Sequence, residues 1–144
     1  MAGRVKSGDK SPGPPRPQLN RMHTPVALSF RRAVPGGAFC LSHCGKDDVR
    51  EVVDCLRQVT TMTWQQVLQT AGKGENKAGL AFTPYRDEDL KKVSRPLWLD
   101  GDVKIAGLRA SQSIRVFGAY LDHTFYVLWF DPNHDIVPIN KNYG

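Results

Sequence analysis

The sequence of 144 residues lacks the features that mark several large classes of protein. No apolar run approaches the roughly 20 residues that a membrane-spanning helix needs, so we expect no membrane span. The N-terminus carries charge without a following apolar segment, which argues against a secretory signal. There are only three cysteines, an odd number, so we expect reduced thiols and a cytoplasmic location rather than a disulfide framework.

Motifs for a metal ion or a nucleotide are also missing. Cys40, His43 and Cys44 form a short cluster of potential ligands. Cys55 lies in a helical pattern, however, and no second close His or Cys pair follows, so a zinc-finger ligand set is absent. Residues 72–74 contain Gly-Lys-Gly without the spacing of a phosphate-binding loop, and they follow a predicted helix instead of a strand. The sequence therefore predicts no metal site and no cofactor.

Positive charge is concentrated at the N-terminus. The net charge is +6, and residues 1–23 contribute +4 of it. These residues include four prolines, three glycines and almost no large apolar side chains, so they cannot bury enough surface to fold. We expect residues 1–23 to form a disordered basic tail and residues 24–144 to form a single α+β domain. The tail is either a simple extension or an arm that contacts nucleic acid.

Two helices are expected in the first half of the domain. The first begins at Asp47 or Asp48 and carries an apolar stripe at spacings of three and four. This stripe consists of Val49, Val52, Val53, Leu56 and Val59. The second helix begins after Thr63, which is a good N-cap, and ends at Gly72. We expect Trp64 to anchor its apolar face in the core.

Residues 104–138 predict a three-stranded antiparallel meander with turns at Ser111-Gln112 and Asp122-His123. If both turns are two-residue loops, Arg115 pairs with Phe130, and Arg109 lies opposite Ile114. Both faces of this sheet are then largely apolar, so both are expected to be covered. The helices can cover one face, and an N-terminal hairpin, a loop or a partner chain must cover the other.

The N-terminal hairpin is predicted from two short apolar stretches, residues 26–30 and 38–42. They are separated by the turn sequence Pro35-Gly36-Gly37. The expected fold is therefore α+β, with two helices packed on a C-terminal three-stranded antiparallel meander. The hairpin is expected to extend the sheet.

Charged residues inside such a sheet need partners and are therefore candidate functional groups. Arg109 and Asp131 fall on the same face, where they form either an ion pair or part of a site. Arg115 has no local partner, and its guanidinium can hold a phosphate by paired hydrogen bonds. His134 is either a general acid or base or a turn residue.

The stretch from residue 72 to 86 is rich in glycine and basic residues. It is either a solvated connector or a loop that brings Lys73, Lys77 and Tyr85 to an anionic ligand.

Four short elements resemble those of a group of small uncharacterised bacterial proteins. The elements are Thr63-Trp64-Gln65, Gly79-Leu80-Ala81-Phe82-Thr83, Arg115-Val116-Phe117-Gly118-Ala119 and Trp129-Phe130-Asp131-Pro132-Asn133-His134. The resemblance spans about residues 38–138 and carries no activity with it.

The order of the predicted elements also resembles the fold of RelE-type toxins. Shared features are a helical pair, a curved antiparallel meander with projecting basic residues and a histidine near its end. This resemblance implies an RNA-binding or metal-independent RNA-cleaving domain of a bacterial toxin–antitoxin system. Its partners would be RNA or the ribosome and a small acidic antitoxin protein.

The resemblance also implies roles for individual residues. Arg115 and Arg109 would stabilise the charged phosphate, and Lys73 and Lys77 would position the RNA. His134 or Tyr85 would transfer protons while the ribose 2′-hydroxyl attacks. The excess of apolar surface for so few helices favours an alternative function, a non-catalytic protein-interaction module that buries its apolar sheet against a partner.

Overall fold

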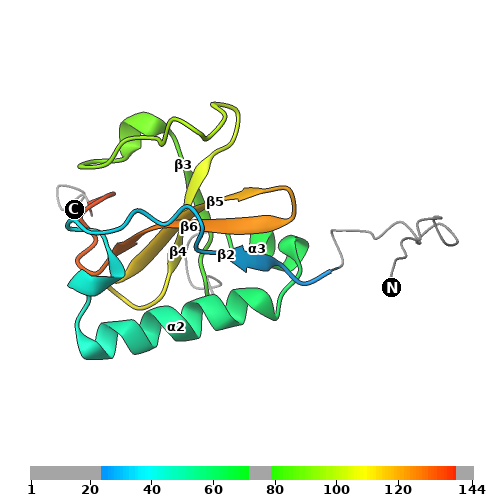
Figure 1. The fold of residues 1–144 in the computed structure, drawn as a ribbon. Helices are drawn as coiled ribbons and strands as arrows, with labels where there is room; N and C mark the ends of the chain where they lie inside the picture. The colour runs from blue at the N-terminus through cyan, green and yellow to red at the C-terminus, as the bar shows by residue number, and fades with distance from the viewer. Residues whose placement is uncertain (1–23, 72–78, 139–144) are drawn as a thin grey trace, which may run out of the picture.

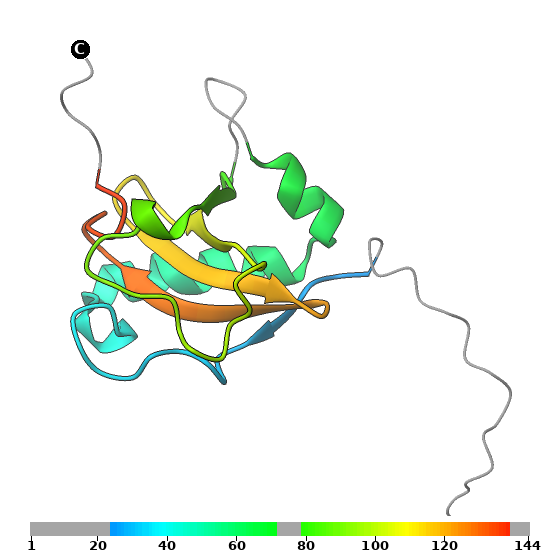
Figure 2. The same ribbon diagram turned by 90° about the horizontal axis from the view of Figure 1, so that it is seen from above.

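The structure, a computed structural model, describes residues 24–71 and 79–138 around a five-stranded sheet (Figures 1 and 2). The order of the strands is β2-β6-β5-β4-β3. Their bounds are β2 (Ala27–Ser29), β3 (Thr83–Tyr85), β4 (Ile105–Arg109), β5 (Arg115–Leu121) and β6 (Thr124–Asp131). β2 pairs with β6 in parallel, whereas the other neighbours are antiparallel. The predicted three-stranded antiparallel sheet is therefore wrong, because the sheet is mixed and gains a strand at each edge. The predicted tail, residues 1–23, lies outside the described residues.

The predicted N-terminal hairpin is also wrong. β2 lies against β6, with Ala27 opposite Thr124 and Ser29 opposite Tyr126. The chain then continues irregularly along the same edge of β6, because Pro35 lacks an N–H and two glycines follow it with positive φ. Two backbone hydrogen bonds, Val34 N–H to Leu128 O and Phe130 N–H to Phe39 O, hold this irregular segment in place. The second predicted strand is replaced by the short helix η2 (Leu41–His43).

The two predicted helices, α2 (Lys46–Thr60) and α3 (Trp64–Gln69), cover one face of the sheet (Figure 1). The Asp48 carboxylate accepts from Gly45 N–H at the start of α2, and Thr63 Oγ1 accepts from Gln66 N–H at the start of α3. Trp64 stacks on Tyr120 of β5, with 3.7 Å between ring centroids. The expected role of Trp64 as a core anchor is therefore confirmed.

The opposite face of the sheet is covered by the chain itself. Residues 86–104, which include the short helix η3 (Asp87–Asp89), pass over it on the side away from α2 (Figures 1 and 2). The buried side chains of this second core are Leu90, Leu99, Ile105, Phe117, Ala119, Leu128, Trp129 and Ile136. The prediction that both faces are covered is confirmed, and a loop provides the second cover. We call the face toward the helices the helix face and the other the loop face.

The β5–β6 hairpin contains the predicted two-residue turn and one β-bulge. Asp122 and His123 both have positive φ, as this tight turn requires, and Leu121 lies opposite Thr124. Beyond Gly118 the register shifts, because Leu128 is inserted opposite the Phe117–Gly118 step. Arg115 consequently faces Asp131, and the predicted pairing with Phe130 is wrong.

The β4–β5 connection is longer than the predicted two-residue loop. Arg109 pairs with Arg115, and Ala110 N–H donates to Ile114 O, so residues 111–113 form the loop. Because side chains alternate across a strand, this one-residue shift moves Ile114 to the helix face, away from Arg109.

Gly118 at the bulge has no room for a side chain. A Cβ there would overlap the backbone carbonyl oxygen of Tyr126 and would lie 2.6 Å from Phe125 Cζ. We predict that Gly118→Ala lowers the free energy of unfolding by about 2–4 kcal/mol, since backbone has to move to relieve the overlap. Urea denaturation measures this loss. Gly101→Ala is the matched control, because a Cβ there has no neighbour within 4 Å; an equal effect of both substitutions contradicts the argument.

Candidate functional site

Two arginines and an aspartate form a row across the three central strands. Arg109 at the end of β4 pairs with Arg115 at the start of β5, and Arg115 pairs with Asp131 at the end of β6. Directly opposed residues have Cβ atoms about 5 Å apart and project from the same face. Since Phe117 is on the loop face, two residues along from Arg115, the row also belongs to the loop face.

Arg115 has a partner that the sequence did not predict. Its Nη1 group donates to the carbonyl oxygens of Ser111 at 2.7 Å, Ile114 at 3.1 Å and Gln112 at 3.2 Å. The side chain therefore closes the β4–β5 loop on itself. Burial lowers the pKa of Arg115, and the nearby charge of Arg109 acts in the same direction. An arginine pKa starts so high that the guanidinium remains charged at neutral pH.

Asp131 is fully buried and is satisfied by the backbone. Its two carboxylate oxygens accept from Asp135 N–H at 2.9 Å and from Ile136 N–H at 2.8 Å. These bonds close the turn that follows β6. The predicted Arg109–Asp131 ion pair is wrong, since the ion pairs among residues 24–71 and 79–138 do not include it.

Arg109 remains without a bonded anion. Its side chain is half-buried, and it makes no hydrogen bond or ion pair with any other described residue. Its backbone N–H is used by the fold, because it donates to Leu80 O at 2.7 Å. Opposed like charges on neighbouring strands are unfavourable, so the Arg109–Arg115 pair is a place where an anion would be stabilised.

Tyr85 reaches the same face from the edge strand β3. It pairs with Ile105, and its ring contacts Phe117 with 5.9 Å between centroids. Gly107 leaves space for this contact, because a Cβ there would lie 3.2 Å from both rings. Burial raises the pKa of Tyr85, although its charge interaction with Arg115 opposes this shift. At neutral pH the phenol is therefore protonated and can donate a proton or a hydrogen bond.

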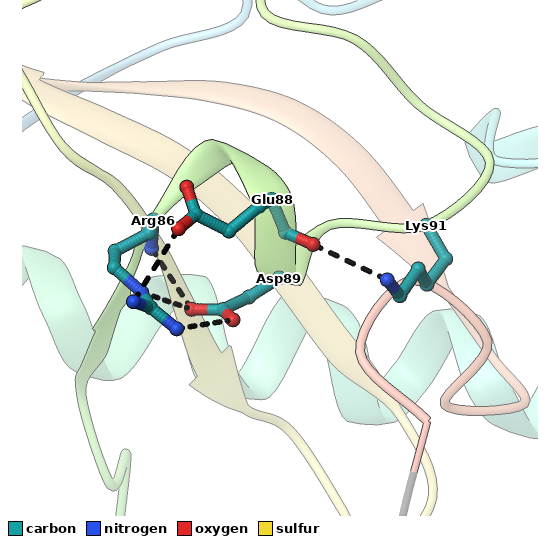
Figure 3. A network of polar contacts seen from close by, with 4 residues as sticks. All are labelled: Arg86, Glu88, Asp89 and Lys91. Atoms are coloured by element: carbon teal, nitrogen blue, oxygen red, sulfur yellow. Dashed lines mark hydrogen bonds and ion pairs between the residues drawn. The ribbon is translucent and has the colours of Figure 1, made fainter.

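Three basic residues that follow Tyr85 in the chain, Arg86, Lys91 and Arg95, are already paired. Figure 3 shows Arg86 in contact with the carboxylates of Glu88 and Asp89, and Lys91 Nζ donating to the backbone oxygen of Glu88. Arg95 binds Asp87 through Nε and Nη2, at 2.9 and 3.0 Å. These contacts hold η3 and the chain around it, and they use cations that would otherwise be available to a ligand.

His134 and the two lysines are not brought into this cluster. His134 lies in the turn after β6 with a positive φ of 61° and makes no hydrogen bond with Arg109, Arg115 or Tyr85. Its Nδ1 is buried without a hydrogen-bond partner among the described residues. Lys73 and Lys77, predicted to contact RNA, lie outside the described residues.

The three cysteines are free thiols in three different environments. A hydrogen bond from the Ser42 hydroxyl, with others from the N–H groups of Ser42, Gly36 and Leu41, lowers the pKa of Cys40. Burial raises the pKa of Cys44, and deeper burial on the inner face of α2 raises that of Cys55 to about 12. In the described part of the chain, no three His, Cys, Asp or Glu side chains are grouped to hold a metal ion.

The partners of Arg115 and Asp131 could not be read from side-chain types, because they are backbone groups of two loops. Asp131-Pro132-Asn133 does carry a turn signal, which indicates a carboxylate that binds nearby N–H groups. No family model, curated protein or solved structure matches the chain. No helix within residues 24–71 and 79–138 is long and apolar enough to cross a membrane.

The different partners of the two arginines predict different effects on stability. Arg115→Ala removes the hydrogen bonds that close the β4–β5 loop, so it should lower the free energy of unfolding by about 1–3 kcal/mol. Arg109→Ala removes no such bond and should change it by less than about 0.5 kcal/mol. Urea denaturation of both variants measures the difference. Equal losses from the two substitutions would show that Arg109 is structural as well.

The cysteine environments predict an order of modification. In the native protein iodoacetamide should react first at Cys40, later at Cys44, and at Cys55 only after unfolding. Because the pKa of Cys40 is lowered, alkylation of Cys40 in the native protein should reach half of its maximal rate at a lower pH than alkylation of the same cysteine in denatured protein. Peptide mapping by mass spectrometry across a pH series measures both. Faster native labelling of Cys44 or Cys55 would contradict the prediction.

Proposed function

We propose that the protein is an RNA-binding domain of the RelE-like toxin type, which holds the RNA backbone on the loop face through Arg109. The observation that carries this proposal is the pair formed by Arg109 and Arg115 on neighbouring strands, with no carboxylate of the described residues bonded to Arg109. A phosphate between two guanidinium groups would relieve their mutual repulsion and gain charge-assisted hydrogen bonds.

The two arginines would contribute differently to this binding. Arg115 uses Nη1 to close the loop, so only Nε and Nη2 remain for a ligand. Arg109 has its whole guanidinium available within the described part of the chain. Arg109 would therefore be the principal phosphate ligand, with Arg115 as a fixed charge beside it.

Tyr85 would supply the chemistry if the bound RNA is also cleaved. The phenol is protonated at neutral pH, so it would act as the proton donor to the leaving 5′-oxygen. The 2′-hydroxyl would attack the phosphorus and lose its proton to water as the bond to the 5′-oxygen breaks, and Arg109 would stabilise the negative charge that develops on the phosphate. The cluster contains no comparable proton acceptor, since Asp131 is held by two backbone N–H groups. RNA binding would not require this acceptor, and a cytoplasmic location would follow from an RNA substrate.

The protein-interaction alternative has less support. It rests on an apolar face of the sheet that needs a partner, whereas the chain covers both faces itself.

RNA binding would depend on local contacts. The described residues carry twelve basic and twelve acidic side chains, so they provide little general attraction for a polyanion.

Binding of a labelled single-stranded RNA of mixed sequence, followed by fluorescence anisotropy, tests the proposal. We predict that Arg109→Ala weakens binding by about tenfold, the usual scale for one charge-assisted phosphate contact. Arg57→Ala is the matched control, since it removes one exposed arginine from α2 and should change affinity less than about twofold. The full chain is used throughout, so that any contribution of the basic residues 1–23 stays constant.

Two outcomes would contradict the proposal. Equal weakening of RNA binding by Arg109→Ala and Arg57→Ala would mean that the RNA responds only to the total charge of the protein. Failure of the unmodified protein to bind RNA would refute the proposed function. The same samples, incubated with a chelator and separated on a denaturing gel, report cleavage. If cleavage occurs, Tyr85→Phe should slow it and leave the affinity unchanged, and 2′-deoxy substitution should abolish it.

A further inference from the structure

A groove unrelated to the arginine row lies between two segments that run over the loop face. One wall is the irregular segment from residue 30 to 39, which follows β2 along the edge of β6. The other wall is residues 92–98. Two adjoining cavities of about 350 and 380 Å³ follow the groove, and both are lined by Ala38, Phe39 and Lys92. Trp129 of β6 lies at the base of the first cavity.

The fold builds this groove in a defined way. The first wall is fixed to β6 at Val34 and at Phe39, on either side of Trp129. The bulge in β6 turns both Leu128 and Trp129 to the loop face, so the indole fills the base between these two attachment points. The two walls are tied together where Arg32 lies over the Trp98 ring, 4.6 Å from its centroid.

Unusual backbone conformations are concentrated around this groove. Gly36 and Gly37 have φ of 71° and 77°, and Lys92 has φ of 69°. His134, with φ of 61°, lies between Asn133 and Asp135, which line the second cavity. A positive φ is unfavourable for lysine, and such strain tends to occur at binding sites.

Apolar and basic side chains are both concentrated on the two walls. Among the described residues, five large apolar side chains are strongly exposed, and three of them belong to the walls: Phe30 at 55%, Val34 at 40% and Leu97 at 105%. The walls also carry Arg31, Arg32, Lys92 and Arg95 and no acidic residue. Arg95 is neutralised by Asp87, whereas the ion pairs within the described residues do not include the other three.

We propose that this groove binds a peptide segment of a partner protein, in which apolar side chains alternate with or adjoin acidic ones. The apolar side chains would fill the cavities against Phe39, Val93 and Trp129. Carboxylates of the same segment would lie near Lys92, which lines both cavities, and those beyond the cavities would meet Arg31 and Arg32 on the first wall. This proposal is independent of RNA binding, because it concerns other residues and a ligand of another class.

The chemistry of the groove favours a polypeptide over RNA. Stacking of bases requires exposed aromatic faces; Trp98 already contacts Arg32 and Tyr126, which leaves Phe30 as the strongly exposed aromatic ring of the described walls. The first cavity is lined mainly by aliphatic and glycine residues, which suit apolar side chains and an approaching backbone. Asp135 at the far end of the second cavity would disfavour a continuous row of phosphates.

A library of random dodecapeptides displayed on phage and selected against the full chain tests this proposal. The expected result is enrichment of sequences that combine Asp or Glu with large apolar residues. A labelled synthetic copy of the most enriched peptide is then titrated by fluorescence anisotropy. Ala38→Trp, which fills both cavities from an exposed position, and Lys92→Glu should each weaken binding by about tenfold or more.

Matched controls separate the groove from general effects of bulk and charge. Gln65→Trp adds the same ring at an exposed position of α3, and Arg57→Glu reverses a charge on α2; both should change affinity less than about twofold. Circular dichroism of each variant verifies that the fold is retained.

Several results would overturn the proposal. These are the absence of enriched sequences, enrichment of peptides without acidic residues, and binding that Ala38→Trp and Lys92→Glu leave unchanged. RNA binding abolished by the same two variants would assign the groove to a nucleic acid. Dimerisation in light scattering that Ala38→Trp abolishes would assign it to a second copy of the chain.

Discussion

The β-bulge at the Phe117–Gly118 step is the constraint on which the arrangement of the loop face depends. Without it, strict alternation would put Leu128 and Trp129 on opposite faces and would set Arg115 opposite Phe130. With Leu128 inserted, both side chains enter the second core, and Asp131 arrives opposite Arg115. Gly118 permits this geometry, because the carbonyl of Tyr126 occupies the space of a side chain there.

Features determined by neighbouring residues were predictable from the sequence, and features determined by distant ones were not. The Thr63 cap, the core position of Trp64 and the tight turn at Asp122-His123 each depend on a few adjacent residues. The parallel pairing of β2 with β6 joins residues almost a hundred positions apart, and no local pattern distinguishes it from a hairpin. The bulge could not be predicted from the sequence either, since an inserted leucine matches the apolar pattern of both registers. For the candidate site, the sequence singled out Arg109, Arg115 and Tyr85, which the structure places on one face of the sheet, but it paired Arg109 with Asp131 and found no local partner for Arg115.

The distribution of charged residues explains why a nearly neutral surface still has two separate positively charged sites. Between residues 86 and 95, Arg86 and Arg95 form ion pairs with neighbouring carboxylates, and these surface pairs contribute little free energy individually. The described cations outside these pairs include Arg109 beside Arg115 on the sheet, and Lys92 with Arg31 and Arg32 on the walls of the groove. A ligand drawn to either place would be selected by local geometry, because the field of the whole described part is weak.

Asp131 determines how these two places are related. Its carboxylate is buried, so it needs strong partners, and it finds them in the backbone N–H groups of Asp135 and Ile136. Because those groups satisfy it, Arg109 is not required as a counter-ion and stays available to an anion. The same two bonds hold the turn that carries Pro132, Asn133 and Asp135 to the second cavity. One buried carboxylate thus supports both surfaces. The residues that would contact each ligand are nevertheless separate. A substitution that affects only RNA binding must therefore be made at Arg109, and one that affects only peptide binding must be made at Lys92.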